Sequence, residues 1–150
     1  MRYEIVSIGQ AKKGFYQDGC QFYIKRLQAY GPVTLKELKP AKQTSQSKEM
    51  ESAALIKAAS GYLIALDEHG KSPKSTAVAE KISDLELQSI SLISFLIGGA
   101  EGHSEALKAR ANELWSLSNL TLPHDLAKLV LLEQVYRAET IRAGHPYHRE

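Results

Sequence analysis

The sequence predicts an α/β fold in which a mainly parallel sheet lies between layers of helix. Two observations lead to this prediction and to the expected number of domains. Short runs rich in Val, Ile and Leu alternate along the chain with longer runs whose apolar residues recur at helical spacing, and this alternation is typical of parallel sheets. The chain also has 150 residues, no internal repeat and no linker rich in Pro, Gly or Ser. We therefore expect one domain over residues 1–150.

The first third of the chain predicts two strands and one helix. Apolar and polar residues alternate over 3–9 until a glycine, which indicates a strand. A helix is expected over 15–30, because its aromatic and aliphatic residues recur near helical spacing and Gly31-Pro32 ends the pattern. A second strand is expected over 33–38. The basic, aperiodic stretch 39–48 indicates a loop.

The middle third continues the alternation. A helix is expected to begin at Ser47, with that serine as its cap, and to stop at Gly61. The apolar run 62–66 predicts a buried strand. A loop is expected over 67–73, where polar residues surround a glycine and end in a proline. The apolar spacing over 76–87 then predicts a helix.

A glycine-rich segment follows the strongest strand candidate, 91–97. The sequence Gly98-Gly99-Ala100-Glu101-Gly102 runs from that strand into a helix expected over 104–113, with Ser104 as its cap. Ligands of open α/β sheets bind at the carboxyl ends of strands. The segment is neither the G-x-G-x-x-G fingerprint nor a P-loop. Taken alone, it fits a simple tight turn as well as a ligand-binding loop.

The segment 115–124 mixes apolar residues with small hydroxyls and an amide, and a last short strand is expected within 115–122. Such a segment can wrap a flat heterocycle, and it can equally be a strand that leads into a turn. A long helix is expected over 126–143, with Asp125 as a candidate N-cap. Within it, Glu133 and Arg137 are four residues apart, the favourable order for a helical ion pair.

The C-terminal tail holds two of the five histidines. A frayed end is its plainest interpretation. A metal site is not expected, because His145 and His148 have no carboxylate or thiolate partner nearby in the sequence. Other chemistry is open to the tail: Arg149 can bind a phosphate, Tyr147 can stack on a base and His148 can carry a proton.

The remaining residues narrow the class of protein. The single cysteine, Cys20, excludes an intramolecular disulfide and is expected to pack inside a helix. His69 and His103 fall in expected loops and are predicted to be surface residues. No apolar run is long enough for a membrane helix, and the N-terminus reads as a strand and not a signal peptide. We therefore expect a cytoplasmic protein.

Five segments occur in order along the chain: FLIGGAEG (95–102), WSLS (115–118), LPH (122–124), LLEQVYRA (131–138) and HPYHR (145–149). With them the sequence resembles the RlmH family of bacterial 23S ribosomal RNA methyltransferases. This resemblance implies a SPOUT fold with a C-terminal trefoil knot, a homodimer, and methylation of N3 of pseudouridine 1915 in the assembled ribosome. The methyl donor that it implies is S-adenosylmethionine.

The resemblance also implies which residues form the sites. For the methyl donor they are Leu66, Gly98, Leu117, Ser118, Asn119, Leu120, Thr121 and Leu122. For catalysis they are His148, Arg149, Tyr147, Arg137 and Glu133. The chain departs from the family at Ala100, where proline is frequent, and at Lys128, where many relatives have arginine. If the latter position binds RNA phosphate, lysine keeps the charge but loses the bidentate geometry.

The charge distribution is uneven. Residues 1–57 hold ten Lys and Arg against five Asp and Glu, which fits either an RNA-binding surface or ordinary solvated charge. The candidates for RNA contact are Lys12, Lys13, Lys25, Arg26, Lys39 and Lys42.

Three other functions remain open at this point. One is a SPOUT methyltransferase acting on another rRNA base or on tRNA. Another is a non-catalytic, ribosome-associated RNA-binding protein. The third is a generic nucleotide-binding α/β protein, which the missing phosphate-loop fingerprints argue against.

Overall fold

The computed structural model describes residues 1–149 and contains a five-stranded sheet. Its strands lie in the order β2-β1-β4-β3-β5, and every neighbouring pair is parallel. The strands are β1 (Arg2–Ile8), β2 (Val33–Leu38), β3 (Tyr62–Lys71), β4 (Leu92–Ile97) and β5 (Glu113–Trp115). The predicted α/β fold with a parallel sheet is confirmed.

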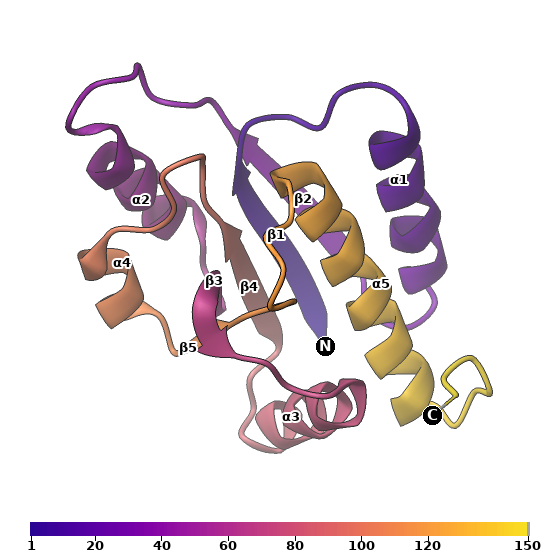
Figure 1. The fold of residues 1–150 in the computed structure, drawn as a ribbon. Helices are drawn as coiled ribbons and strands as arrows, with labels where there is room; N and C mark the ends of the chain where they lie inside the picture. The colour runs from indigo at the N-terminus through magenta and orange to yellow at the C-terminus, as the bar shows by residue number, and fades with distance from the viewer. Residues whose placement is uncertain (150) are drawn as a thin grey trace.

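Helices cover both faces of this sheet (Figure 1). They are α1 (Phe15–Leu27), α2 (Ser47–Ala58), α3 (Ser75–Leu87), α4 (Glu105–Arg110) and α5 (His124–Arg142). Helix α5 packs between α1 and α3 on one face, and α2 and α4 pack together on the other. Consecutive strand residues therefore enter different cores: Ile5 faces the α1-α3-α5 layer and Val6 the α2-α4 layer. Strands buried on both faces explain the continuous apolar runs.

The expected loop over 67–73 is wrong, because β3 continues to Lys71. After an irregularity that follows Leu66, Lys71 resumes pairing with Trp115 of β5. The strand is extended there by main-chain pairing with β5. The polar side chains of residues 67–71 do not predict a strand.

The chain between α4 and α5 also differs from the expectation. Helix α4 ends at Arg110 and not at 113, because Glu113 enters β5. The last strand therefore comes earlier than predicted, and Trp115 is its only residue within the expected range 115–122. Residues 116–122 form no helix or strand.

Of the two serines predicted as helix caps, one is confirmed and the other is not. The cap at Ser104 is confirmed, since its Oγ accepts a hydrogen bond of 3.1 Å from the backbone N–H of Leu107. The cap at Ser47 is wrong. Its hydroxyl instead donates to the carbonyl of Thr44 at 2.9 Å, and the helix is preceded by Gln46, which makes no side-chain cap.

Two expectations about residues in the first turns of α5 are wrong. The helix begins at His124, so Asp125 lies in its first turn and is not the N-cap; a carboxylate there still favours the positive end of the helix dipole. Lys128 is buried, and its Nζ lies 3.0 Å from Oε2 of Glu37. The idea that this lysine binds RNA phosphate is therefore wrong for the structure described, because its charge is already paired inside the protein.

A buried carboxylate lies in the middle of the sheet. Glu4 accepts hydrogen bonds from the hydroxyl of Ser94 (2.6 Å) and the backbone N–H of Ser60 (2.7 Å), and the Lys36 ammonium lies 2.8 Å away. Burial alone would raise the pKa of Glu4, but the bonds from Lys36, Ser94 and Ser60 outweigh it, so the pKa is lowered.

Glu4→Gln is expected to lower the free energy of unfolding at pH 7 by about 2 kcal/mol, because charge-assisted hydrogen bonds are lost. Since the folded-state pKa lies below the unfolded one, the carboxylate stabilises the protein fully above the unfolded pKa. That contribution disappears as the pH falls through the folded pKa. Urea unfolding between pH 7 and pH 3 should show a shallower acid loss in Glu4→Gln than in wild type. The exposed Glu49→Gln is the control; identical pH slopes in Glu4→Gln and wild type would contradict this account.

Three further findings concern residues 1–149. None of their helices is long and apolar enough to cross a membrane. No group of three or more His, Cys, Asp or Glu side chains in this part of the chain is arranged to hold a metal ion. Cys20 is buried in α1, as predicted.

Candidate active site

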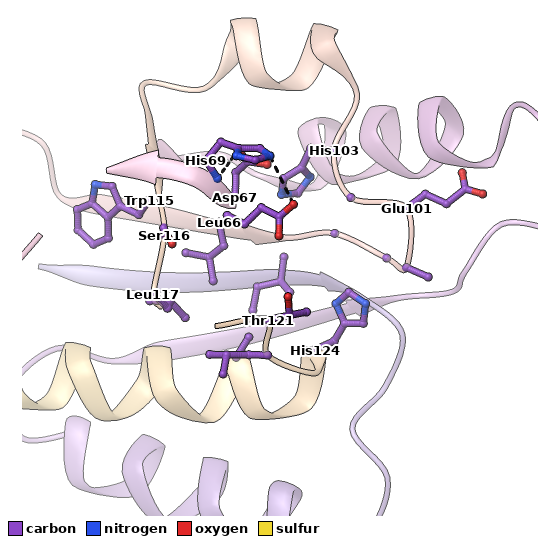
Figure 2. A pocket seen from close by; sticks show the side chains of 18 of the residues that line it. Leu66, Asp67, His69, Glu101, His103, Trp115, Ser116, Leu117, Thr121 and His124 are labelled. Carbon is purple, nitrogen blue, oxygen red and sulfur yellow. Dashed lines mark hydrogen bonds and ion pairs between the residues drawn. The ribbon is translucent and has the colours of Figure 1, made fainter. Parts of the chain in front are cut away.

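A cavity of about 400 Å³ opens where β3 and β4 end at their carboxyl edge, beside the irregular segment 116–122. In Figure 2, Leu66 and His103 lie on one side of it and Thr121 and His124 on the other. Of the eight residues expected at the donor site, seven line this cavity and Asn119 does not. The seven are Leu66, Gly98, Leu117, Ser118, Leu120, Thr121 and Leu122.

A tight turn forms the end of the cavity that follows β4. The backbone N–H of Gly102 donates to the carbonyl of Gly99 at 3.0 Å, and Gly102 has a φ of +78°, which favours glycine. A side chain at Gly98 would begin 3.1 Å from Nδ1 of His103, and one at Gly99 would begin 2.6 Å from Oε1 of Glu51. These two glycines therefore make room for the protein's own side chains.

Two hydroxyls fix the irregular segment that borders the cavity. The buried Ser116 donates from Oγ to the carbonyl of Ser118 at 2.9 Å, and Oγ of Ser118 accepts from the backbone N–H of Leu120 at 2.9 Å. The N–H of Ser116 also donates to the carbonyl of Lys71, at 2.7 Å. The segment thus keeps a defined shape without regular secondary structure, and Leu120, 76% exposed, stands at the cavity rim.

Negative charge predominates around the cavity. Its lining holds four carboxylates and two lysines: Asp67, Glu68, Glu101, Glu105, Lys48 and Lys108. Lys108 lies 3.7 Å from both Asp67 and Glu105. The surplus of carboxylates favours a ligand that carries positive charge.

His103 was expected at the surface, and this prediction is wrong. The side chain is only 4% exposed, lines the cavity and lies with Nε2 3.3 Å from the carbonyl oxygen of Leu96. Burial lowers the pKa of its imidazole, so the neutral form is favoured. Position alone could have indicated this residue, because it directly follows the glycine-rich turn.

The C-terminal tail forms a second cluster, on α5. The Arg137 guanidinium is bonded to Oε1 of Glu133 at 2.6 and 2.9 Å, which confirms the predicted ion pair. It lies 4.9 Å from the ring centre of Tyr147 and 3.1 Å from Nδ1 of His148. The hydrogen bond with Glu133 raises the pKa of Arg137. These contacts hold the tail against α5 in place of a frayed end.

The tautomer of His148 follows from its partner. A guanidinium can only donate hydrogen bonds, so Nδ1 of His148 accepts from Arg137 and a neutral ring carries its proton on Nε2. The tyrosine of the cluster is also perturbed, because burial raises the pKa of Tyr147. Arg149 is exposed at the end of the described chain.

The cavity and the tail cluster do not meet within one chain. His124 lines the cavity at the start of α5, whereas Glu133 lies nine residues later, about 14 Å along the helix axis. Figure 1 shows the tail at the opposite end of α5. The expected donor residues and the expected catalytic residues thus form two separate groups.

The basic candidates also divide into two groups. Lys12, Lys13, Lys39 and Lys42 follow β1 and β2, at the carboxyl edge of the sheet that carries the cavity, and all four are exposed. Lys25 and Arg26 lie in the last turn of α1. The Arg26 guanidinium stacks 4.2 Å above the ring of Phe22.

A parallel sheet with a cavity at the carboxyl ends of its strands defines an α/β protein of the ligand-binding type. The family model described as "Predicted SPOUT methyltransferase" matches residues 1–148. A protein from Deinococcus radiodurans, named "Ribosomal RNA large subunit methyltransferase H", is 41% identical over 150 residues and 99% of each chain. One of the same name from Polynucleobacter asymbioticus is also 41% identical, over 100% of each chain.

The fold has a solved counterpart in a probable methylase family protein from Haemophilus influenzae. The two structures superpose with a TM-score of 0.53 at 14% identity, over 99% of this chain and 70% of the other. The chain belongs to the SPOUT methyltransferases and, within them, to the family of the large-subunit ribosomal RNA methyltransferases H.

Proposed function

We propose that this protein transfers a methyl group from S-adenosylmethionine to N3 of pseudouridine 1915 in 23S ribosomal RNA. The observation that carries the proposal is the full-length similarity to relatives named for large-subunit ribosomal RNA methylation. The substrate proposed is the assembled ribosomal particle. The protein acts in the cytoplasm as a single domain over residues 1–150.

The cavity suits the methyl donor in size, shape and charge. Its volume of about 400 Å³ lies within the range of small-molecule sites. Leu66, Leu117 and Leu122 offer apolar surface for the faces of an adenine ring, and the main chain of 116–122 offers donors and acceptors for its edge. The surplus of carboxylates suits a sulfonium cation. Bound there, S-adenosylmethionine supplies a methyl group already activated by positive charge.

Donor binding is tested with a substitution that fills the cavity. Leu117→Arg is expected to weaken S-adenosylmethionine binding at least about tenfold, because it places a bulky cation beside the sulfonium site. Leu87→Arg, at an 85% exposed leucine of α3, is the matched control and should bind as wild type does. Calorimetry measures both dissociation constants. Equal affinities in the two variants would place the donor elsewhere.

The chemistry requires removal of a proton from the imide nitrogen of the base. The nitrogen is a poor nucleophile while protonated, so proton acceptance or stabilisation of the anionic ring must accompany in-line alignment. In this proposal Tyr147 stacks on the base and Arg149 stabilises negative charge on a ring carbonyl. Arg137, positioned by Glu133, orients the tail.

His148 can either donate a hydrogen bond to the base or accept its N3 proton. The tautomer of the ring decides which of the two is available. While Arg137 donates to Nδ1, the Nε2–H of His148 can donate to a ring carbonyl oxygen. For His148 to accept the N3 proton, Arg137 must first leave Nδ1. The substrate carbonyls offer the guanidinium alternative acceptors, so base binding itself can release Nδ1.

A homodimer resolves the separation of the two groups of residues. One copy provides the donor cavity and its partner provides the tail. Exposed aromatic residues on α1 support such a contact, since Phe15 and Phe22 are 71% and 50% exposed. Aromatic ring contacts continue from Phe22 through Tyr23 and Tyr136 to the tail at Tyr147.

The membership in the SPOUT methyltransferases supports a C-terminal trefoil knot, with 116–123 as its threaded segment.

RNA binding through the carboxyl-edge loops has a measurable signature. Replacing both Lys39 and Lys42 with alanine is expected to weaken binding to 23S rRNA fragments and to reduce the salt slope by about one unit for each phosphate that a lysine neutralises. Lys57→Ala, at the far end of α2, is the matched control. Binding is measured by titration at several salt concentrations. An unchanged slope in the double variant would remove these lysines from the RNA surface.

A further inference from the structure

We propose that Glu51 joins the basic loop 39–46 to the glycine-rich turn 98–102, so that RNA and the methyl donor strengthen each other's binding. Glu51 lies outside the cavity lining and acts in this role as a positioning residue. The inference rests on the proposed function, because it takes the loop to meet RNA and the turn to border the donor.

The carboxylate of Glu51 lies between these two segments. The side chain belongs to α2 and is only 7% exposed. Its Oε2 accepts a hydrogen bond of 2.9 Å from the backbone N–H of Ala41 in the loop. Its Oε1 stands on the side of Gly99 that has no side chain, since a Cβ atom there would lie 2.6 Å from it. One carboxylate therefore contacts two segments that are far apart in the sequence.

The loop supplies the hydrogen bond that this buried charge needs. None of the ion pairs formed among residues 1–149 includes Glu51. A buried carboxylate without a cation is costly, and a hydrogen bond to the charged oxygen offsets part of that cost. If the loop moved away, the charge would lose the N–H of Ala41 while it stayed buried. The carboxylate therefore favours the loop in the position described.

Helix α2 also holds the far end of the turn. Oγ of Ser52, a residue only 1% exposed, accepts a hydrogen bond of 2.9 Å from the backbone N–H of Ser104. Ser104 in turn caps α4. Lys48, in the first turn of α2, lines the cavity itself. The helix thus contacts the donor turn at both ends, and Glu51 connects that turn to the loop.

The lysines proposed to bind RNA flank the bonded residue. Lys39 and Lys42 stand on either side of Ala41 in the sequence, and both are exposed. Phosphates held by these lysines fix the main chain at Ala41, and through Glu51 they fix the wall of the cavity at Gly99. A donor that meets a wall already held in place binds more tightly. By thermodynamic linkage, the donor must strengthen RNA binding by the same factor.

The test measures this factor directly. The dissociation constant for ribosomes that lack the methyl group is determined by co-sedimentation, without and with saturating S-adenosylhomocysteine. In the wild-type protein S-adenosylhomocysteine is expected to tighten ribosome binding at least about fivefold, and in Glu51→Ala less than about twofold. Glu51→Gln keeps an oxygen acceptor for the N–H of Ala41, so it should retain a factor above about threefold.

Controls separate this role from general damage. Glu49→Ala removes an exposed carboxylate of the same helix and should keep the wild-type factor. Thermal unfolding reports whether each variant is folded. If Glu51→Ala fails to fold, Ala41→Pro removes the donated N–H without altering α2, and it too is expected to bring the factor below about twofold.

The outcomes distinguish coupling from a merely structural role. A structural role would weaken the binding of each ligand alone and leave the factor unchanged, and that result would overturn the inference. A wild-type factor near one would overturn it as well, while leaving the donor cavity and the RNA surface in place. If the wild-type protein binds neither S-adenosylhomocysteine nor ribosomes, the proposed function itself fails.

Discussion

Arg137→Ala is expected to lower the turnover number at least about 100-fold. This is the smallest effect typical of losing general acid–base catalysis. The dissociation constant for S-adenosylmethionine should stay within about twofold of wild type. Arg137 contacts Glu133, Tyr147 and His148, so its removal releases the tail. The cavity is spared, because Arg137 lies thirteen residues after His124, about 20 Å along α5.

Single-turnover methylation and calorimetry measure these two quantities separately. Arg110→Ala, at an exposed arginine that ends α4, is the matched control. Arg137→Lys should recover little activity, because lysine lacks the fork that joins Glu133 and His148 at once. His148→Ala and Arg149→Ala should also lose turnover and keep donor binding. Near-native turnover in these variants would contradict the chemistry assigned to the tail.

Mixing two inactive variants is expected to restore activity. Leu117→Arg damages the cavity and keeps the tail, while Arg137→Ala damages the tail and keeps the cavity. In a mixed dimer, one of the two sites combines the intact cavity of one copy with the intact tail of the other. Random exchange of subunits should then yield about one quarter of the wild-type activity, since half the dimers are mixed and each has one working site.

The control for this experiment is each variant alone at the same total concentration, with the dimer verified by size-exclusion chromatography. Subunits are exchanged by mild denaturation and refolding of the mixture. Activity that stays at the level of the separate variants would show that each tail serves its own chain. The homodimer would then have no part in forming the active site.

The central strands could be predicted from the sequence because they are buried on both faces. Ile64 and Ala65 of β3 enter opposite cores as neighbours in sequence, which produces the unbroken apolar run 62–66. The extension of β3 to Lys71 could not be predicted, because it depends on main-chain pairing with β5. Such pairing leaves no apolar pattern in the side chains.

Burial of polar residues depends on contacts between distant parts of the chain. Lys128 was considered only as a possible contact to RNA phosphate, but Glu37 of β2 meets it inside the protein. His103 looked like a loop residue, and the end of β4 at Leu96 supplies its partner. No local pattern indicates either pairing.

The candidate site was predicted in its parts and not in its arrangement. The segments around Leu66, Gly98 and 117–122 meet at one cavity, as expected for the carboxyl ends of parallel strands. The tail residues meet Glu133 and Arg137. The distance between these two groups is set by the length and direction of α5, which only the folded chain reveals.

The most direct test of the account is methyl transfer to ribosomes that contain the pseudouridine but lack its methyl group. The ribosomes are incubated with the protein and labelled S-adenosylmethionine, and the labelled nucleotide is mapped by nuclease digestion and mass spectrometry. The account predicts label at N3 of pseudouridine 1915 alone, and none with free 23S rRNA. Label on another nucleotide would overturn the substrate, and no transfer together with no donor binding would contradict the enzyme and support a non-catalytic RNA-binding protein.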